Sequence, residues 1–214
     1  MDVPQAEKEL KLSRRERKKR AQKQEIYQAA LALFKERGYE NATIDMIAEA
    51  ADIGRATFFN YYPAKADILR EIADSAVRHA NGVFDEEFGE GAGPVVDKIK
   101  RSFTRFARIV ERAPECYQTV FLEVMRSHTG SVDDETAARP NLIEVLTTHL
   151  RAEQQKGELD AAFDPGQLSE MLTGIYMYTI LNFGMRNFSY SLVERIEKAA
   201  EIFTAGCAAG PSQD

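Results

Sequence analysis

The sequence predicts an all-α chain of about nine helices. Apolar residues recur with helical spacing along almost all of its 214 residues, and no segment shows the alternating pattern of a half-buried strand. Glycine and proline interrupt this periodicity, most clearly in the segment 89–94, GEGAGP. Hydrophobic residues make up 44% of the chain, which is enough to bury a sizeable core.

The first well-defined helix carries one apolar stripe with the i, i+3, i+4, i+7, i+8 spacing. Its members are Ile26, Ala29, Ala30, Leu33 and Phe34. We expect this helix to end at Arg37, because the next residue, Gly38, is favourable just after a helix. Thr43 is a candidate N-cap for a second, short helix over residues 44–51.

The segment 51–54, ADIG, predicts a tight turn into a third helix, Arg55–Tyr61. Asp52 tolerates a left-handed backbone, and Gly54 can serve as the N-cap of the third helix. Three short helices with a tight turn between the second and the third describe a helix-turn-helix unit. In such a unit the third helix enters the major groove of DNA.

The third helix divides into a core face and a groove face. Phe58 and Tyr62 lie four residues apart, so we expect both to pack against the two preceding helices. The residues left to face outward are Arg55, Thr57, Asn60 and Tyr61. Arginine can contact guanine with two hydrogen bonds, asparagine suits adenine, and a threonine methyl suits the thymine methyl.

The charge is unevenly distributed along the chain, although the net charge is -6. Residues 1–65 carry 13 Lys/Arg and 10 Asp/Glu, whereas residues 66–214 carry 15 and 24. This asymmetry predicts a basic DNA-binding domain, 1–65, joined to an acidic helical regulatory domain, 66–214. The run Arg14–Lys23 can be a solvated tail or a helix start. Ahead of a helix-turn-helix we expect an arm that follows phosphates or reaches a minor groove, through Arg14, Arg15 and Lys18.

For the regulatory domain, the sequence predicts a long helix from Lys65 to about Phe88. Further helices are expected to begin near Pro94, Pro114 and Pro140. Apolar and aromatic residues at helical spacing form either a filled core or the wall of an apolar pocket, and the sequence leaves both readings open. The candidate pocket residues are Phe103, Phe106, Tyr117, Phe121, Met125 and Tyr176.

The segment Thr43–Leu69, TIDMIAEAADIGRATFFNYYPAKADIL, resembles the signature of the TetR family of bacterial repressors. The shared features are a helix that starts at Thr, a turn of the Ala-Gly-Val-Ser type, an aromatic recognition helix and Pro-x-Lys. Three residues depart from the family pattern: Asp52 replaces a turn glycine, Gly54 a serine cap, and Phe59 a common tyrosine.

The resemblance implies that Thr43 and Lys65 hold phosphates, and that five residues approach bases. These five are Arg55, Ala56, Thr57, Asn60 and Tyr61. It also implies a homodimer on a palindromic operator, released by a small apolar or aromatic inducer. The last two helices, 168–186 and 192–207, are the candidates for the dimer face. Its expected residues are Leu172, Leu192, Ile196 and Phe203.

Three alternatives remain: a DNA-binding regulator without an inducer, an all-α enzyme, and an adaptor on a membrane surface. The sequence has no Gly-rich phosphate loop, HExxH or GxSxG motif, so neither catalysis nor a cofactor is expected. The most apolar run, Met171–Met185, has 15 residues, fewer than the ~20 of a membrane span, so no membrane partner is expected. Two distant cysteines, Cys116 and Cys207, fit a reducing cytoplasm.

Overall fold

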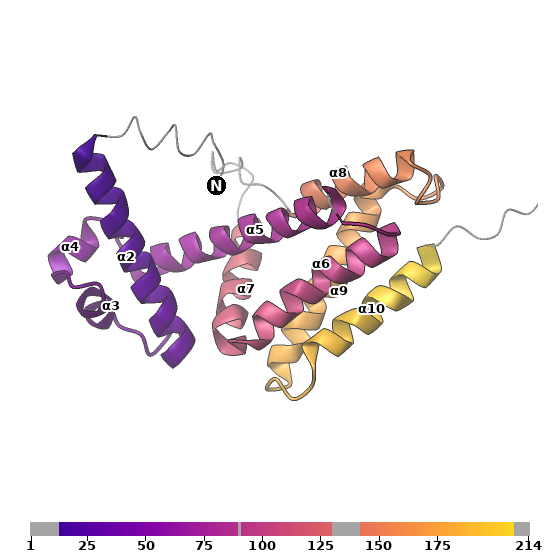
Figure 1. Cartoon of the computed structure of the whole chain (residues 1–214). Helices are drawn as coiled ribbons and strands as arrows, with labels where there is room; N and C mark the ends of the chain where they lie inside the picture. The colour runs from indigo at the N-terminus through magenta and orange to yellow at the C-terminus, as the bar shows by residue number, and fades with distance from the viewer. Residues whose placement is uncertain (1–12, 90, 130–141, 208–214) are drawn as a thin grey trace, which may run out of the picture. The chain divides into compact units, whose positions relative to one another are not determined.

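The computed structural model describes residues 13–89, 91–129 and 142–207, and all regular structure in these ranges is helical, as predicted. The described helices in Figure 1 are α2 (Arg14–Arg37), α3 (Ile44–Ala50), α4 (Arg55–Phe59), α5 (Lys65–Gly89), α6 (Val95–Glu111), α7 (Pro114–Thr129), α8 (Leu142–Gln155), α9 (Pro165–Met185) and α10 (Leu192–Cys207). The start of the expected N-terminal arm, residues 1–12, and the helix opening expected at Pro140 lie outside the described residues.

The chain divides into two compact units, of which one ends at Ile72 and the other begins at Ala73. This division falls within α5, a few residues after the boundary that the charge pattern suggests at Lys65. The reason is that Ile68, Leu69 and Ile72 are all buried. The first two turns of α5 therefore complete the hydrophobic core of the N-terminal unit.

Helix α2 begins well before its apolar stripe. The hydroxyl of Ser13 accepts a hydrogen bond from the amide of Glu16 at 3.3 Å, and the Glu16 carboxylate accepts one from the amide of Ser13 at 2.8 Å. This reciprocal capping box stabilises a helix start, so the basic run Arg14–Lys23 is helical. A helix start is one of the readings that the sequence left open for this run, and its expected contact with the DNA backbone or a minor groove stays a prediction.

The three N-terminal helices pack around one small core. Ile26, Ala30 and Phe34 follow one face of α2 and are buried, and Ile47 of α3 and Phe58 of α4 are fully buried with them. In Figure 1, α3 and α4 lie along one side of α2. Helices as short as α3 and α4 are not stable alone. Their packing against the α2 stripe is therefore what keeps them folded.

The turn between α3 and α4 has the predicted backbone. The hydroxyl of Thr43 caps α3 by accepting a hydrogen bond from the amide of Met46 at 3.2 Å. Asp52 adopts the left-handed conformation with a φ of 51°. Gly54 is the N-cap of α4 and provides no side-chain hydrogen bond. The sequence therefore predicts this turn correctly, including its unusual residues.

Helix α4 is shorter than predicted, because it ends at Phe59 rather than at Tyr61. The amide of Tyr61 donates to the carbonyl of Phe58 at 2.9 Å, three residues back, so the chain tightens into a turn. Pro63 follows and disfavours a helical backbone at Tyr62. The last residues expected in the recognition helix consequently lie in a turn that leads to α5.

The ammonium group of Lys65, the first residue of α5, holds the loop between α2 and α3. Its Nζ donates to the carbonyl oxygens of Tyr39 at 2.7 Å, Ala42 at 3.0 Å and Glu40 at 3.5 Å. It also lies 4.2 Å from the centroid of the Tyr39 ring, within cation–π range. An ammonium has three donors. This arrangement therefore uses all of them to tie α5 to the loop that precedes α3.

In the C-terminal unit, α6 packs along α10 and α8 packs along α9 (Figure 1). An aromatic cluster occupies the centre of this unit: Phe84 of α5, Phe103 and Phe106 of α6, and Tyr176 of α9. The contacting rings have centroid separations from 5.1 to 6.2 Å. None of the described helices, the apolar α9 included, is long and apolar enough to cross a membrane.

A buried ion pair joins α6 to α8. Lys98 Nζ lies 3.2 Å from both carboxylate oxygens of Glu153, whose side chain is only 3% exposed, and Lys156 Nζ approaches the same carboxylate to 2.7 Å. Burial by itself raises the pKa of Glu153. The hydrogen bonds from Lys156 and Lys98 outweigh burial, so the pKa is lowered from its ordinary value of 4.5. Stability from this pair is therefore present above pH 4.5 and is lost as the pH falls through the lowered pKa.

Replacing Lys65 by methionine tests its structural role, because methionine retains an apolar stem and removes the ammonium. Three loop carbonyls lose their donor, so we expect a loss of about 1–3 kcal/mol in the free energy of unfolding. Thermal unfolding followed by circular dichroism measures it. Lys19→Met, at an exposed position of α2, is the control and should leave the transition in place. A fully stable Lys65→Met protein would contradict this role.

Replacing Glu153 by glutamine tests the buried ion pair. We expect a loss of about 3 kcal/mol in the free energy of unfolding, because Lys98 is left buried without its countercharge. Urea unfolding measures the loss, and the variant should also lose less of its remaining stability than the wild type when the pH falls below 4.5. Glu201→Gln removes an exposed partner of Lys100 and should barely move the midpoint. Equal effects of the two substitutions would contradict the assignment.

Candidate nucleic-acid interface

Helix α4 presents most of its predicted base-reading residues to solvent. Arg55, Ala56 and Asn60 are exposed, and Thr57 is half-buried. Phe58 lies on the opposite face and is 0% exposed. The predicted division of this segment into a core face and an outward face is therefore present in the structure, and the contact of the outward face with bases stays a prediction.

Tyr61 lies partly against α2 instead of pointing fully outward. Its hydroxyl donates a hydrogen bond to Oε1 of Gln22 at 2.8 Å, which ties the end of the α4 segment to α2. Phe59, expected only as a departure from the family pattern, is 41% exposed and lies on the solvent side of α4. The Tyr61 hydroxyl oxygen can still accept a hydrogen bond from a base, whereas donating one to a base requires breaking the bond to Gln22.

Arg55 makes two contacts within the N-terminal unit. Its Nη1 lies 2.7 Å from both carboxylate oxygens of Asp45 in the first turn of α3. Its guanidinium carbon lies 5.6 Å from the centroid of the Phe59 ring. Sequence reasoning did not identify Asp45, Phe59 or Gln22 as neighbours of the reading residues. The pairs Asp45–Arg55 and Gln22–Tyr61 join different segments of the chain, so no local sequence pattern predicts them.

The basic residues of α2 are available on its first turns. Arg14, Arg15 and Lys18 are all exposed. Lys18 and Gln22 are four residues apart and therefore share one face of the helix. Because Gln22 contacts Tyr61, this basic face continues toward α4. The pattern Ser13-x-x-Glu16 is the sequence signal that could have predicted the helical start of this run.

The two residues expected to hold phosphates already make contacts inside the protein. The Thr43 hydroxyl accepts from the Met46 amide, and its own hydrogen remains available for donation. The Lys65 ammonium is committed to the three carbonyl groups of the loop before α3. Thr43 can cap α3 and contact a phosphate together, whereas Lys65 has to release part of the loop to do so.

The residues predicted to line a ligand pocket lie in different surroundings. Phe103, Phe106 and Tyr176 are buried in ring contact with one another, and burial raises the pKa of the Tyr176 hydroxyl. Phe121 is buried and Tyr117 is partly buried against the same core. Met125 is 41% exposed. Its expected position in an interior wall is therefore wrong.

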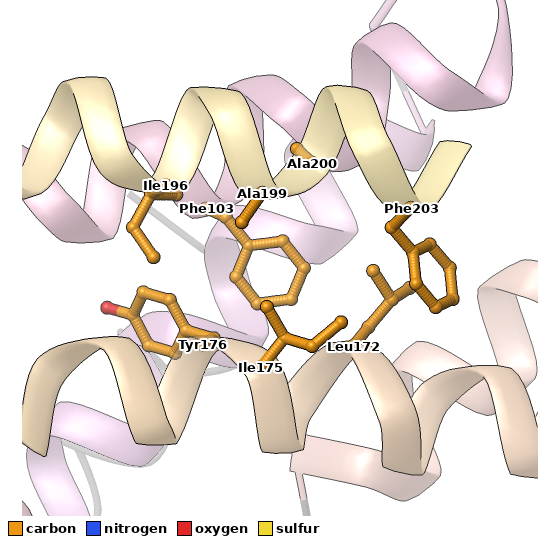
Figure 2. A pocket seen from close by; sticks show the side chains of 8 residues that line it. All are labelled: Phe103, Leu172, Ile175, Tyr176, Ile196, Ala199, Ala200 and Phe203. Atoms are coloured by element: carbon orange, nitrogen blue, oxygen red, sulfur yellow. The ribbon is translucent and has the colours of Figure 1, made fainter. Parts of the chain in front are cut away.

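A small cavity opens between α9 and α10, with α6 behind it (Figure 2). Its lining is apolar apart from one tyrosine hydroxyl: Phe103, Leu172, Ile175, Tyr176, Ile196, Ala199, Ala200 and Phe203. The cavity volume is about 20 Å³, which is room for roughly one water molecule. Two of the six predicted pocket residues, Phe103 and Tyr176, belong to this cavity, and the ligand-binding role of the predicted set stays a prediction.

Three of the four residues predicted for a dimer face require a correction. Leu172, Leu192 and Ile196 are at most 4% exposed, because they pack into the core of their own protomer. Phe203 is partly buried against the same core. The exposed apolar residues occupy neighbouring positions on the same helices, and one of them, Ile175, also lines the edge of the cavity. They are Met171, Ile175, Tyr178 and Met185 on α9 and Ile202 on α10, and we call them the outer stripe.

Comparison with known proteins agrees with this geometry. Residues 26–72 match the family model described as bacterial regulatory proteins, tetR family. The transcriptional regulator AcuR of Cereibacter sphaeroides is 27% identical over 154 residues, 69% of each chain. The matched segment 26–72 contains the whole turn and α4.

Solved structures of the same fold cover almost the whole chain. A TetR-family repressor from Thermus thermophilus, FadR in complex with lauroyl-CoA, has a TM-score of 0.67 and 23% identity, covering 90% of this chain and 98% of its own. RolR in complex with resorcinol has a TM-score of 0.64 and 18% identity, covering 91% of each. Residues 26–72 therefore form a DNA-binding domain of the TetR family of bacterial regulatory proteins, and the chain has the fold of solved TetR-family structures.

Proposed function

We propose that this TetR-family regulator is a dimeric repressor that reads a palindromic operator with α4 and releases it when a small apolar or aromatic molecule binds the C-terminal body. The observation that carries the proposal is the surface of α4. Arg55, Ala56 and Asn60 are exposed there, while Phe58 fixes the helix from behind. Because its proposed partner is the bacterial chromosome, the proposal includes a cytoplasmic location.

The chemistry of α4 suits a mixed base sequence. Arg55 can give two parallel hydrogen bonds to guanine, Asn60 can pair with adenine, and the Thr57 methyl can contact thymine. The exposed basic residues on the first turns of α2 supply charge for phosphates on the flank of the same site. Residues 1–65 thus act as the DNA-binding domain, and residues 66–214 as the regulatory domain.

The outer stripe supports the proposal of a dimer. Tyr178 is 65% exposed and Met185 71% exposed, and exposed apolar residues grouped along a helix often mark an interface. Two copies of α9 and α10 meeting across a two-fold axis would bury this stripe in a four-helix bundle. A two-fold axis also explains an operator with two half-sites, spaced by about one helical turn or a multiple of it.

The described cavity of about 20 Å³ is too small for an organic ligand, so an inducer that binds there has to enlarge it. Relatives of the same fold are described in complex with lauroyl-CoA and with resorcinol, which suggests that such a body can open around apolar or aromatic compounds. Helix α5 contributes residues to both units and is the natural element to transmit the change. The filled aromatic cluster favours a second candidate function, a regulator that has no inducer.

Selection of bound duplexes from a random pool tests DNA reading. The wild type should return a palindrome, and Arg55→Ala should weaken binding to it by about 1–3 kcal/mol while relaxing the preference at one base pair of each half-site. Lys18→Ala, the control for a phosphate contact, should weaken binding to every sequence and lower the log–log salt slope by about 0.9 per contact. If Arg55→Ala instead weakens binding to every DNA sequence equally, Arg55 contacts a phosphate and not a base.

Charge in the outer stripe tests the dimer. Tyr178→Glu should shift the protein to a monomer in sedimentation experiments, because a carboxylate cannot be buried unpaired in an apolar interface. Operator affinity should fall with it, since one half-site then binds alone. The matched control is Leu122→Glu, an exposed apolar position on α7, which should remain dimeric. If the Tyr178→Glu protein remains a dimer, the dimer interface lies elsewhere on the protein.

Titration with lauroyl-CoA and with resorcinol tests the inducer. A true inducer class should weaken operator binding by about 5- to 150-fold, the range of ordinary allosteric coupling, and should raise the thermal midpoint of the free protein. Phe203→Trp, which adds volume beside the cavity, is expected to reduce that response. If neither probe nor a wider apolar panel changes operator affinity, the candidate without an inducer is the correct one.

A further inference from the structure

Arg55 is held in place by a carboxylate from the neighbouring helix. It opens α4, and its Nη1 lies 2.7 Å from both oxygens of Asp45 on α3. The ring of Phe59, one turn further along α4, lies 5.6 Å from the guanidinium carbon, within the range of a cation–π contact. Contacts from two different residues therefore restrict a side chain that would otherwise sample many rotamers.

Stability does not explain this ion pair. The side chains of Arg55 and Asp45 are 58% and 67% exposed, and water screens exposed pairs so strongly that they contribute little to folding. A carboxylate beside a DNA-reading helix also repels phosphates, which lowers affinity for every DNA sequence. The position of Asp45 is therefore unfavourable for affinity to DNA in general. If Asp45 contributes to function, it does so through its contact with Arg55.

The benefit lies in which donors the carboxylate uses. Among the residues that the structure describes, Asp45 engages Nη1 of Arg55, which leaves Nε and Nη2 for other partners. These two nitrogens form one edge of the planar guanidinium. An arginine edge with two parallel donors matches the O6 and N7 acceptors of guanine in the major groove.

We infer that Asp45 and Phe59 are positioning residues, which hold Arg55 ready to read a guanine before DNA arrives. The inference rests on the proposed reading role of α4 and adds the residues that set its specificity. An oriented side chain loses less conformational freedom on binding, and this gain is realised only at the base pair that Arg55 reads. Asp45 thus lowers affinity for DNA in general and raises discrimination at one position.

The test compares the full-length wild type with Asp45→Asn on the selected operator, on operators with each base pair replaced, and on unrelated duplex DNA. Asp45→Asn should bind unrelated DNA more tightly. Its preference at the base pair read by Arg55 should fall by about two- to fivefold, with other positions unchanged. In an Arg55→Ala background the same substitution should no longer affect that preference.

Glu49→Gln is the matched control, because it removes one exposed charge from the same helix. It should raise affinity for all DNA and leave every base preference intact. Phe59→Leu gives a second, charge-neutral measurement. It should weaken the same base preference without tightening the binding of unrelated DNA, and it keeps the inference testable if Asp45→Asn folds poorly.

Two results would overturn the inference while the proposed function stands. If Asp45→Asn tightens binding and leaves all preferences unchanged, Asp45 is only a repulsive charge. If the preference at that base pair sharpens instead, the ion pair restrains Arg55 away from its base. A wild type without any sequence preference would overturn the proposed function and the inference together.

Discussion

The burial of Phe58 is the constraint on which the DNA-facing surface depends. Helix α4 has five residues, too few to be stable without packing. The Phe58 ring is fully buried, with an edge-to-face contact to Phe59 at 5.5 Å and a tilted contact to Tyr62 at 6.0 Å. Because this ring points inward, Arg55 and Asn60 point outward. The hydrophobic effect therefore orients the polar residues of α4, although none of them contributes to the core.

Side-chain hydrogen bonds supply stability that the short helices α3 and α4 lack on their own. The Thr43 hydroxyl caps α3, Lys65 gathers three carbonyl groups of the preceding loop, and Tyr61 is tied to Gln22 on α2. The first bond closes the start of α3, and the bonds of Lys65 and Tyr61 join different segments of the N-terminal unit. Rigidity matters for a reader of bases, because a misplaced donor loses both the distance and the angle of its hydrogen bond.

In the C-terminal unit, close packing of the core opposes the binding of a ligand. Its aromatic cluster is closely packed, and the Tyr176 hydroxyl is buried among apolar groups, which raises its pKa. A ligand much larger than water that enters the described cavity between α9 and α10 has to displace some of these rings. Binding there must therefore offset the free energy of opening a packed core.

The sequence by itself determined the helical class, the turn with Asp52 and Gly54, and the inward position of Phe58, because these follow from local spacing and backbone preference. The capping box at Ser13 was also readable locally. Only the tertiary structure decided which side of α9 is covered. Leu172 is buried and its neighbour Met171 is exposed, and in a helix that is apolar almost all round no periodicity distinguishes them. The contact between Asp45 and Arg55 was also decided by the tertiary structure. A contact between two helices depends on how the helices pack, and it cannot be read from the residue spacing within either helix.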